Sequence, residues 1–188
     1  AVVTLNEFVS TFFTDNSGAG PAMADTFNVF DAANHQGNSG TAALASAAVQ
    51  SAIVAMLKYT NSASKRLGVR PRYLLAPPDL AFTAQLITES TQAPGTANND
   101  VNVLRGALET VVVPQWTDAN NWYLMADPNL IEGIELGFLG GQETPDLLVQ
   151  DNPTDGSVFT NDAISYKVRH IFGGGWLDYR AGYASIVV

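Results

Sequence analysis

Cysteine is missing from this chain of 188 residues, and histidine occurs only twice. Without cysteine the chain can form no disulfide, no thiol nucleophile and no cysteine-ligated zinc or iron–sulfur site. The absence fits a reducing cytoplasm or a particle that is stabilised by other means. No apolar run approaches the ~20 residues that span a bilayer, and no signal peptide opens the chain, so we expect no membrane association.

Charge is scarce as well. Charged residues make up 14% of the chain, well below the ~25% that is typical of soluble domains. The shortfall indicates that much of the surface contacts other copies of the chain. The net charge of −9 argues against a nucleic-acid-binding module, which needs a basic face to neutralise phosphates. An acidic protein can nevertheless enclose DNA without binding it tightly.

The length is enough for one domain, or for two lobes that share strands. Hydrophobic residues make up 46% of the sequence, which allows a sizeable core. The chain begins with Ala1 instead of methionine. We therefore expect a processed product or a fragment with further sequence upstream.

The first half of the sequence predicts three helices and one strand. Apolar residues at helical spacing predict a helix over 5–13, followed by a turn at 14–21 and a structured loop or small hairpin at 22–40. Alanine-rich residues 41–59 predict the clearest helix. A buried strand is expected at 73–76, and Pro77-Pro78 opens a helix that runs to about Glu89, with Phe82 and Leu86 on one face.

The second half predicts strands. Short strands are expected at 111–113, 122–126, 134–139 and 147–149. Residues 164–172 alternate, with Tyr166, Val168 and His170 on one face, which predicts one long, half-buried strand. The alternating run 177–183 is expected to pair antiparallel with it, and Gly173-Gly174-Gly175 between the two is expected to form a bend or bulge.

Neither histidine lies in a pattern that predicts catalysis. His35 lies in a turn-like stretch and could be exposed, whereas His170 is expected to be partly buried with its hydrogen bonds satisfied. No second histidine or paired carboxylate falls at metal-ligand spacing. The sequence contains no Gly-x-Ser-x-Gly elbow and no phosphate-binding loop. We therefore predict no catalytic, cofactor-binding or metal-binding residues.

Two further patterns have simple structural interpretations. Residues 151–156, with Asp162 at the twelfth position, resemble half a calcium loop, but Pro153 replaces a ligand and Asp162 replaces the usual long glutamate. A polar turn between strands is the better interpretation. Lys65, Arg66, Arg70 and Arg72 form the main basic concentration. A helix-end dipole explains part of it, and ion pairs at a subunit interface are a second interpretation.

Several phrases, in order and at matching spacing over nearly the whole chain, resemble the Mu-like bacteriophage major head subunit (major capsid protein) family. They are Arg70–Leu75 followed by Pro77-Pro78, Leu104–Glu109 followed by Val111–Pro114, Trp122–Pro128, Ile131-Glu132 with Phe138–Gln142 and Thr144-Pro145, and Tyr166–His170 with Phe172-Gly173 and Leu177–Arg180. Residues 14–16, 18–21 and 34–38 add to the likeness. No single phrase is specific by itself.

The resemblance implies an α+β (mixed α/β) fold, namely the tailed-phage major capsid fold (Hong Kong 97-like), with an axial lobe and a peripheral lobe that carries a long β-ribbon. Residues 1–40 would supply the end of the spine helix and a peripheral-lobe loop. Residues 41–128 would form the axial lobe, and 129–188 the long strands that return to the peripheral lobe. The N-terminal arm and extended loop of the family, which clasp neighbouring subunits, would lie upstream and are absent from this sequence.

The implied function is that of a structural protein, not an enzyme. The chain would self-assemble into hexamers and pentamers of an icosahedral shell that encloses DNA without sequence-specific binding. Scaffold and portal proteins would be its partners during assembly, the bacterial host cytoplasm its place of assembly, and the virion its location. A phage decoration or surface-binding module is the alternative, and a small α/β hydrolase is a weaker one.

Overall fold

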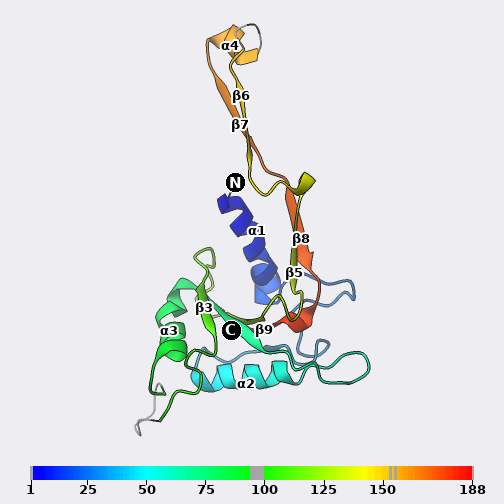
Figure 1. Ribbon diagram of the computed structural model, residues 1–188, viewed down its shortest axis with the longest axis vertical. Coiled ribbons are helices and arrows are strands. Elements are labelled where there is room, and N and C mark those ends of the chain that lie inside the picture. The colour runs from blue at the N-terminus through cyan, green and yellow to red at the C-terminus, as the bar shows by residue number, and fades with distance from the viewer. Residues whose placement is uncertain (1, 94–99, 153, 155, 188) are drawn as a thin grey trace.

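The computed structural model describes residues 2–93, 100–152, 154 and 156–187, and it combines helices and strands as the sequence predicts. Figure 1 shows two regions: a sheet with helices packed on it, and a long arm that rises from it. The elements in chain order are α1 (Val2–Thr14), β1 (Ser39–Gly40), α2 (Ser46–Leu57), β2 (Pro71–Ala76), α3 (Ala81–Glu89), β3 (Glu109–Val112), β4 (Trp122–Ala126), β5 (Ile134–Phe138), β6 (Asp146–Gln150), α4 (Gly156–Asn161), β7 (Ser165–Arg169), β8 (Phe172–Trp176) and β9 (Gly182–Ser185).

The sheet has five strands in the order β1-β9-β4-β2-β3. Strand β4 is central and runs antiparallel to both β2 and β9, whereas β3 pairs in parallel with β2 at one edge. Strand β1 lies early in the sequence and pairs in parallel with β9, which lies near its end, so segments far apart in the sequence complete one edge of the sheet. We call this sheet, together with α1, α2 and α3, the sheet lobe.

Side chains that alternate along β4 supply two cores. Trp122 and Leu124 pack with α2 and α3 on one face of the sheet. Tyr123 packs with Phe12, Phe13 and other aromatic residues on the opposite face, which α1 covers. Because both faces are covered, β4 is an almost continuous run of buried residues, as expected of a strand between two layers.

Helix α2 is shorter than its sequence predicts. It begins at Ser46, so residues 41–45 of the predicted helix lie outside it. The carbonyl oxygen of Ala42 accepts hydrogen bonds from the indole of Trp122 at 3.0 Å and from the hydroxyl of Ser185 at 2.6 Å. These two tertiary hydrogen bonds hold Ala42 against the sheet, and they outweigh the helix propensity of the alanine-rich segment.

Helix α1 is fixed to the sheet by a buried tyrosine. The hydroxyl of Tyr123 lies 3.1 Å from the carbonyl oxygen of Phe13 and 3.2 Å from that of Gly18, within donating distance of both. Gly18 has a φ of 95°, and a Cβ there would lie 2.7 Å from the side-chain amide nitrogen of Asn121. The turn after α1 therefore needs glycine at this position.

The arm, residues 134–176, differs from the predicted strand arrangement. Residues 164–172 do not form one strand, because β7 ends at Arg169 and β8 begins at Phe172. Strand β7 pairs with β6 and β8 pairs with β5, while the 177–183 run turns away and ends in β9, beside β4. The three glycines lie inside β8 and form no bend.

Candidate assembly surface

The outer part of the arm is a two-stranded ribbon, β6 paired with β7, with the short helix α4 at its tip (Figure 1). No other strand pairs with this ribbon within the described residues. Every residue of β7 and four of the five residues of β6 are exposed. An isolated two-stranded hairpin has little stability of its own in water. The outer ribbon is therefore an element that needs a partner surface.

One face of the outer ribbon is entirely apolar. Leu147 is paired with Val168, and Val149 with Tyr166, and residues opposite each other in a ribbon share a face. The relative exposures of these four residues are 63%, 59%, 47% and 68% respectively. Phe159 on α4, at 74%, adds to the apolar surface near the tip. Contiguous exposed apolar surface of this kind marks an interaction site.

The other face of the outer ribbon is mostly polar and makes contacts within the arm. Arg169 pairs with Asp146 at 3.2 Å, and Lys167 lies opposite Leu148. Hydrogen bonds from the side chains of Gln142 and Arg169 lower the pKa of Asp146. The two faces therefore differ, and the apolar one is the candidate for contact with another molecule.

The inner ribbon, β5 paired with β8, anchors the arm to α1. The ring centroids of Phe8 and Phe172 lie 5.3 Å apart, and the indole of Trp176 donates to the carbonyl oxygen of Phe12 at 3.0 Å. Gly174 allows the two strands to pack closely, since a Cβ at this position would come within 2.8 Å of Leu136 Cδ2. The arm thus has a fixed base and a free outer half.

His170 lies where the two ribbons meet, and its predicted hydrogen bonds are absent. The imidazole packs against Phe138 and Phe172, at centroid distances of 5.7 and 5.0 Å. Within the described residues, neither ring nitrogen has a hydrogen-bond partner. The prediction of partial burial is confirmed, and that of a satisfied histidine is wrong, because no polar group of the described residues lies within hydrogen-bonding reach of either nitrogen.

His35 is buried, so the prediction of an exposed loop side chain is wrong. Its Nδ1 lies 2.9 Å from the carbonyl oxygen of Val29, and its Nε2 lies 2.8 Å from a carboxylate oxygen of Asp25. The ring stacks on Tyr179 at a centroid distance of 4.1 Å. The hydrogen bond from His35 lowers the pKa of the Asp25 carboxyl. His35 is only 1% exposed, and it is buried by tertiary packing that the local sequence does not encode.

The pairing of His35 with Asp25 is the arrangement closest to a catalytic dyad. A general base needs a free nitrogen within reach of its substrate. In His35 one nitrogen faces a backbone carbonyl, the other faces Asp25, and the ring is shielded from solvent. The pair therefore holds the 22–37 loop in place and has no nitrogen available for a substrate.

Among the described residues, the lining of an apolar groove between α1 and the segment after β3 contains no ionisable side chain. The residues that line it are Leu5, Asn6, Val9, Ser10, Phe13, Leu75, Val112, Val113, Pro114, Gln115, Trp116 and Leu136. Enzyme sites usually combine an apolar pocket with convergent titratable groups. This groove has the apolar lining of such a site but lacks the titratable groups, so it gives no support for a catalytic site.

The segment that resembles half a calcium loop forms the tip of the arm. Residues 156–161 are the helix α4, and Asp162 follows with a φ of 52°. Pro153 and Asp155 lie outside the described residues. Among the residues that are described, no group of three or more histidine and carboxylate side chains could hold a metal ion. The flanks are strands, as predicted, but the connection between them contains a helical turn.

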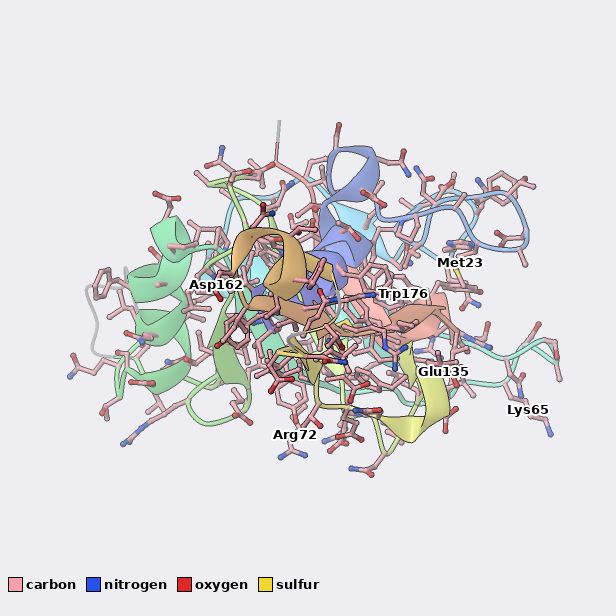
Figure 2. The ribbon with its side chains drawn as sticks, turned by 90° about the horizontal axis from the view of Figure 1, so that it is seen from above. Met23, Lys65, Arg72, Glu135, Asp162 and Trp176 are labelled. Carbon is pink, nitrogen blue, oxygen red and sulfur yellow. The ribbon has the colours of Figure 1, made fainter. Side chains whose placement is uncertain are left out.

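Of the four basic residues grouped by sequence, Arg72 lies apart from Lys65 and Arg66 in the structure. Arg72 on β2 pairs with Asp127 at 2.6 Å, and hydrogen bonds from the backbone and side chain of Asn129 and from Arg72 lower the pKa of this carboxyl. Lys65 and Arg66 lie in a loop beyond the end of α2, and Figure 2 shows Lys65 far from Arg72. Helix α2 ends at Leu57, several residues before Lys65, which removes the dipole explanation.

A family model described as "Phage capsid protein" matches residues 1–185. No curated protein matches the chain. The match extends from α1 through the last strand, β9, and so covers both the sheet lobe and the arm. Within the described ranges, no helix has the length and apolar character needed to cross a bilayer.

Proposed function

Because this chain belongs to the phage capsid protein family, we propose that it is the major head subunit of a Mu-like tailed phage or prophage. Copies of it would form hexamers and pentamers that build an icosahedral shell around DNA. The family is structural, and we propose no enzymatic activity for this member. The phrases that resemble Mu-like head subunits support the finer assignment, since they fall in both regions of the molecule.

The lobes of the tailed-phage capsid fold can be proposed from the two regions. The axial lobe would consist of residues 41–128, whose sheet is completed by β1 and β9. The peripheral lobe would receive residues 1–40, with α1 as the end of the spine helix, and the strands of residues 129–188 that return to it, apart from β1 and β9, which lie in the sheet. In this proposal α1 connects the two lobes, because it packs on the sheet through Phe13 and on the arm through Phe8.

The exposed apolar face of the outer ribbon carries the proposal. Leu147, Val149, Tyr166 and Val168 form one uninterrupted face, and no described residue of the chain covers it. Burial of such a face against a neighbouring subunit would contribute roughly 25 cal/mol per Å² of apolar surface removed from water. The low charge content of the whole chain points in the same direction.

The acidic net charge fits the enclosure of DNA. With 18 carboxylates and nine basic residues, the inner wall of a shell would repel phosphates more than it binds them. Scaffold and portal proteins would be partners during assembly in the host cytoplasm, and the finished location would be the virion. A decoration or surface-binding module is the competing function, but it predicts a closed barrel or sandwich, whereas this chain has an open five-stranded sheet.

Electron microscopy of the full-length protein, co-expressed with its scaffold, tests the proposal. We expect icosahedral shells for the wild type and their loss in the variant Tyr166→Ser/Val168→Ser, which makes the apolar face polar. Lys167→Ser, on the opposite face of the same strand, is the matched control and should assemble. A wild type that stays monomeric by light scattering under all conditions would refute the proposal.

A further inference from the structure

Positive and negative charges are segregated along the sequence. Between Asp31 and Asp79 the chain contains no aspartate or glutamate at all. Five of its nine basic residues lie in that interval, namely Lys58, Lys65, Arg66, Arg70 and Arg72. Of these five, Arg72 alone forms an ion pair within the described residues. A chain that is acidic overall therefore contains one segment with four basic side chains that have no carboxylate partner there.

These four basic residues lie on or beside one ordered loop, residues 58–70, which we call the basic loop. Asn61 organises its turn, because its side-chain oxygen accepts from the backbone nitrogens of Ala63 and Lys65. The base of the loop is held by Gln36, whose side chain bonds both the nitrogen and the carbonyl oxygen of Thr60. The exposed Lys65 and Arg66 are therefore displayed from a defined backbone, which lowers the entropic cost of binding.

The opposite end of the sheet lobe has the complementary character. It is formed by residues 79–89, which include α3, and by residues 100–103, and we call it the acidic end. Figure 2 shows α3 and Lys65 at opposite sides of the molecule. Asp79, Glu89 and Asp100 are exposed there, with Arg105 as the neighbouring basic residue. The same end exposes four large apolar residues to solvent, with relative exposures of 83% for Phe82, 55% for Leu86, 80% for Val101 and 71% for Val103.

Helix α3 buries one face against the sheet and exposes the apolar side chains on its other face. Its inward face consists of Ala84, Ile87 and Thr88, which are buried against the sheet. Phe82 and Leu86 point away from that contact, although their residue type favours burial. A helix that exposes a phenylalanine beside carboxylates is suited to an interface with an apolar centre and a charged rim. On the basic loop, Leu67 is 40% exposed and can contribute to that centre.

We propose that the basic loop of one copy docks on the acidic end of the next copy, so that subunits join head to tail around a ring. This inference rests on the proposed shell function and names the surfaces that would close its capsomers. Two different patches at opposite ends of a subunit make a heterologous contact, and such contacts produce closed rings when the rotation between subunits fits. The arm stands apart from this contact, since it rises from the sheet lobe between the two ends (Figure 2).

The charges favour an identical subunit over DNA as the partner of the basic loop. The basic loop could also attract DNA phosphates, but its four cations are few for a nucleic-acid site, and within the described part of the chain no aromatic side chain stands exposed on the loop for base stacking. The acidic end of an identical neighbour offers both opposite charge and apolar surface. Exposed ion pairs are screened by salt, so ring formation through this contact should weaken as ionic strength rises.

Removal of the charge tests the contact first. In the full-length protein, Lys65→Gln/Arg66→Gln should raise the concentration required for capsomer formation by about tenfold. The matched control is Gln50→Glu/Ser51→Glu, which lowers the net charge equally at exposed positions of α2, between the two ends. Analytical ultracentrifugation and electron microscopy are the measurements, and the control should assemble like the wild type.

Charge reversal and mixing give the decisive result. Lys65→Glu/Arg66→Glu and Glu89→Lys/Asp100→Lys should each fail to form rings alone, and an equal mixture of the two should form rings again. Recovery on mixing also demonstrates that both variants are folded. If either reversal assembles normally, if mixing restores nothing, or if the reversals lower only DNA retention while assembly is unchanged, the contact is refuted. A wild type that forms neither rings nor shells would instead overturn the proposed function, and this contact with it.

Discussion

The central strand β4 consists of apolar and aromatic residues and is buried, whereas the ribbon strand β7 carries Tyr166 and Val168 between polar residues and is exposed. Trp122, Tyr123 and Leu124 on β4 are each at most 1% exposed, whereas Tyr166 and Val168 on β7 are 68% and 59% exposed. Helices cover both faces of β4, while among the described residues β6 is the one strand that pairs with β7. The comparison teaches that apolar strands in this chain serve two purposes: the stability of the subunit and contact between subunits.

The largest effect is expected in the sheet lobe. Leu124→Ala removes a side chain with no solvent exposure and leaves a cavity between the sheet and α2. We expect a loss of ~2–5 kcal/mol in the free energy of unfolding, measured by denaturant titration of the unassembled protein. A loss below ~1 kcal/mol would mean that β4 is not the centre of the stable region, and the comparison between the two strands would fail.

A smaller effect is expected at the base of the arm. In Gly174→Ala the new methyl group would meet the backbone carbonyl of Glu135 and the side chain of Leu136. We expect this overpacking to lower the free energy of unfolding by ~1–3 kcal/mol. Thermal unfolding is the measurement. Gly173→Ala is the matched control, because a Cβ there has no neighbour within 4 Å. Equal losses in the two variants would contradict the pairing of β5 with β8.

The loop that carries His35 should give a modest, pH-dependent effect. The pKa of Asp25 is lowered from its usual 3.8, mainly by the hydrogen bond from His35. The stabilisation from a carboxyl with a lowered pKa is present above its unfolded-state pKa and is lost as the pH falls through the folded value. Asp25→Asn should therefore lower the melting temperature at pH 7, and the difference from the wild type should shrink below pH 3.8.

The control for that measurement is Asp15→Asn, which removes an equal charge from a carboxylate that forms no ion pair within the described residues. Its melting temperature should follow the wild type at both pH values. If the two variants behave alike, the pairing of His35 with Asp25 does not stabilise the 22–37 loop.

The smallest effect on subunit stability is expected in the outer ribbon. Leu147→Ala shortens a side chain that is already 63% exposed, so the free energy of unfolding of the unassembled protein should change by no more than ~0.5 kcal/mol. The same variant should weaken assembly, because the apolar face loses part of its area. A large loss of stability together with normal assembly would reverse the proposed roles of the sheet lobe and the arm.

Local patterns predicted most of the elements. Helices at 5–13 and 78–89 and strands at 73–76, 122–126, 134–139 and 147–149 all occur, with ends shifted by a few residues. Hydrophobic spacing and turn residues act over short distances, which is why these predictions were possible. The predicted strand over 164–172 was wrong, because His170 and Ile171 form the joint between two ribbons and alternation alone carries no information about a change of partner.

The candidate surfaces were harder to predict. Alternation in 164–172 indicated a buried face, but the residues that would cover Tyr166 and Val168 are absent from the described chain. This face could have been predicted only by noticing that the sequence contains more apolar strand faces than its other elements can cover. The basic concentration near Lys65 was visible in the sequence, whereas its placement opposite α3 depends on how α2 crosses the sheet (Figure 1).

The sequence by itself determined the mixed composition of helices and strands, the scarcity and segregation of charge, and the resemblance to phage head subunits that the family match supports at the level of phage capsid proteins. Each is a property of local order or of composition. The tertiary structure alone decided that β9 joins β4, that His35 is buried against Tyr179, and that one apolar ribbon is left uncovered. These outcomes depend on contacts between residues distant in sequence, whose free energies are set by the packing of the whole chain.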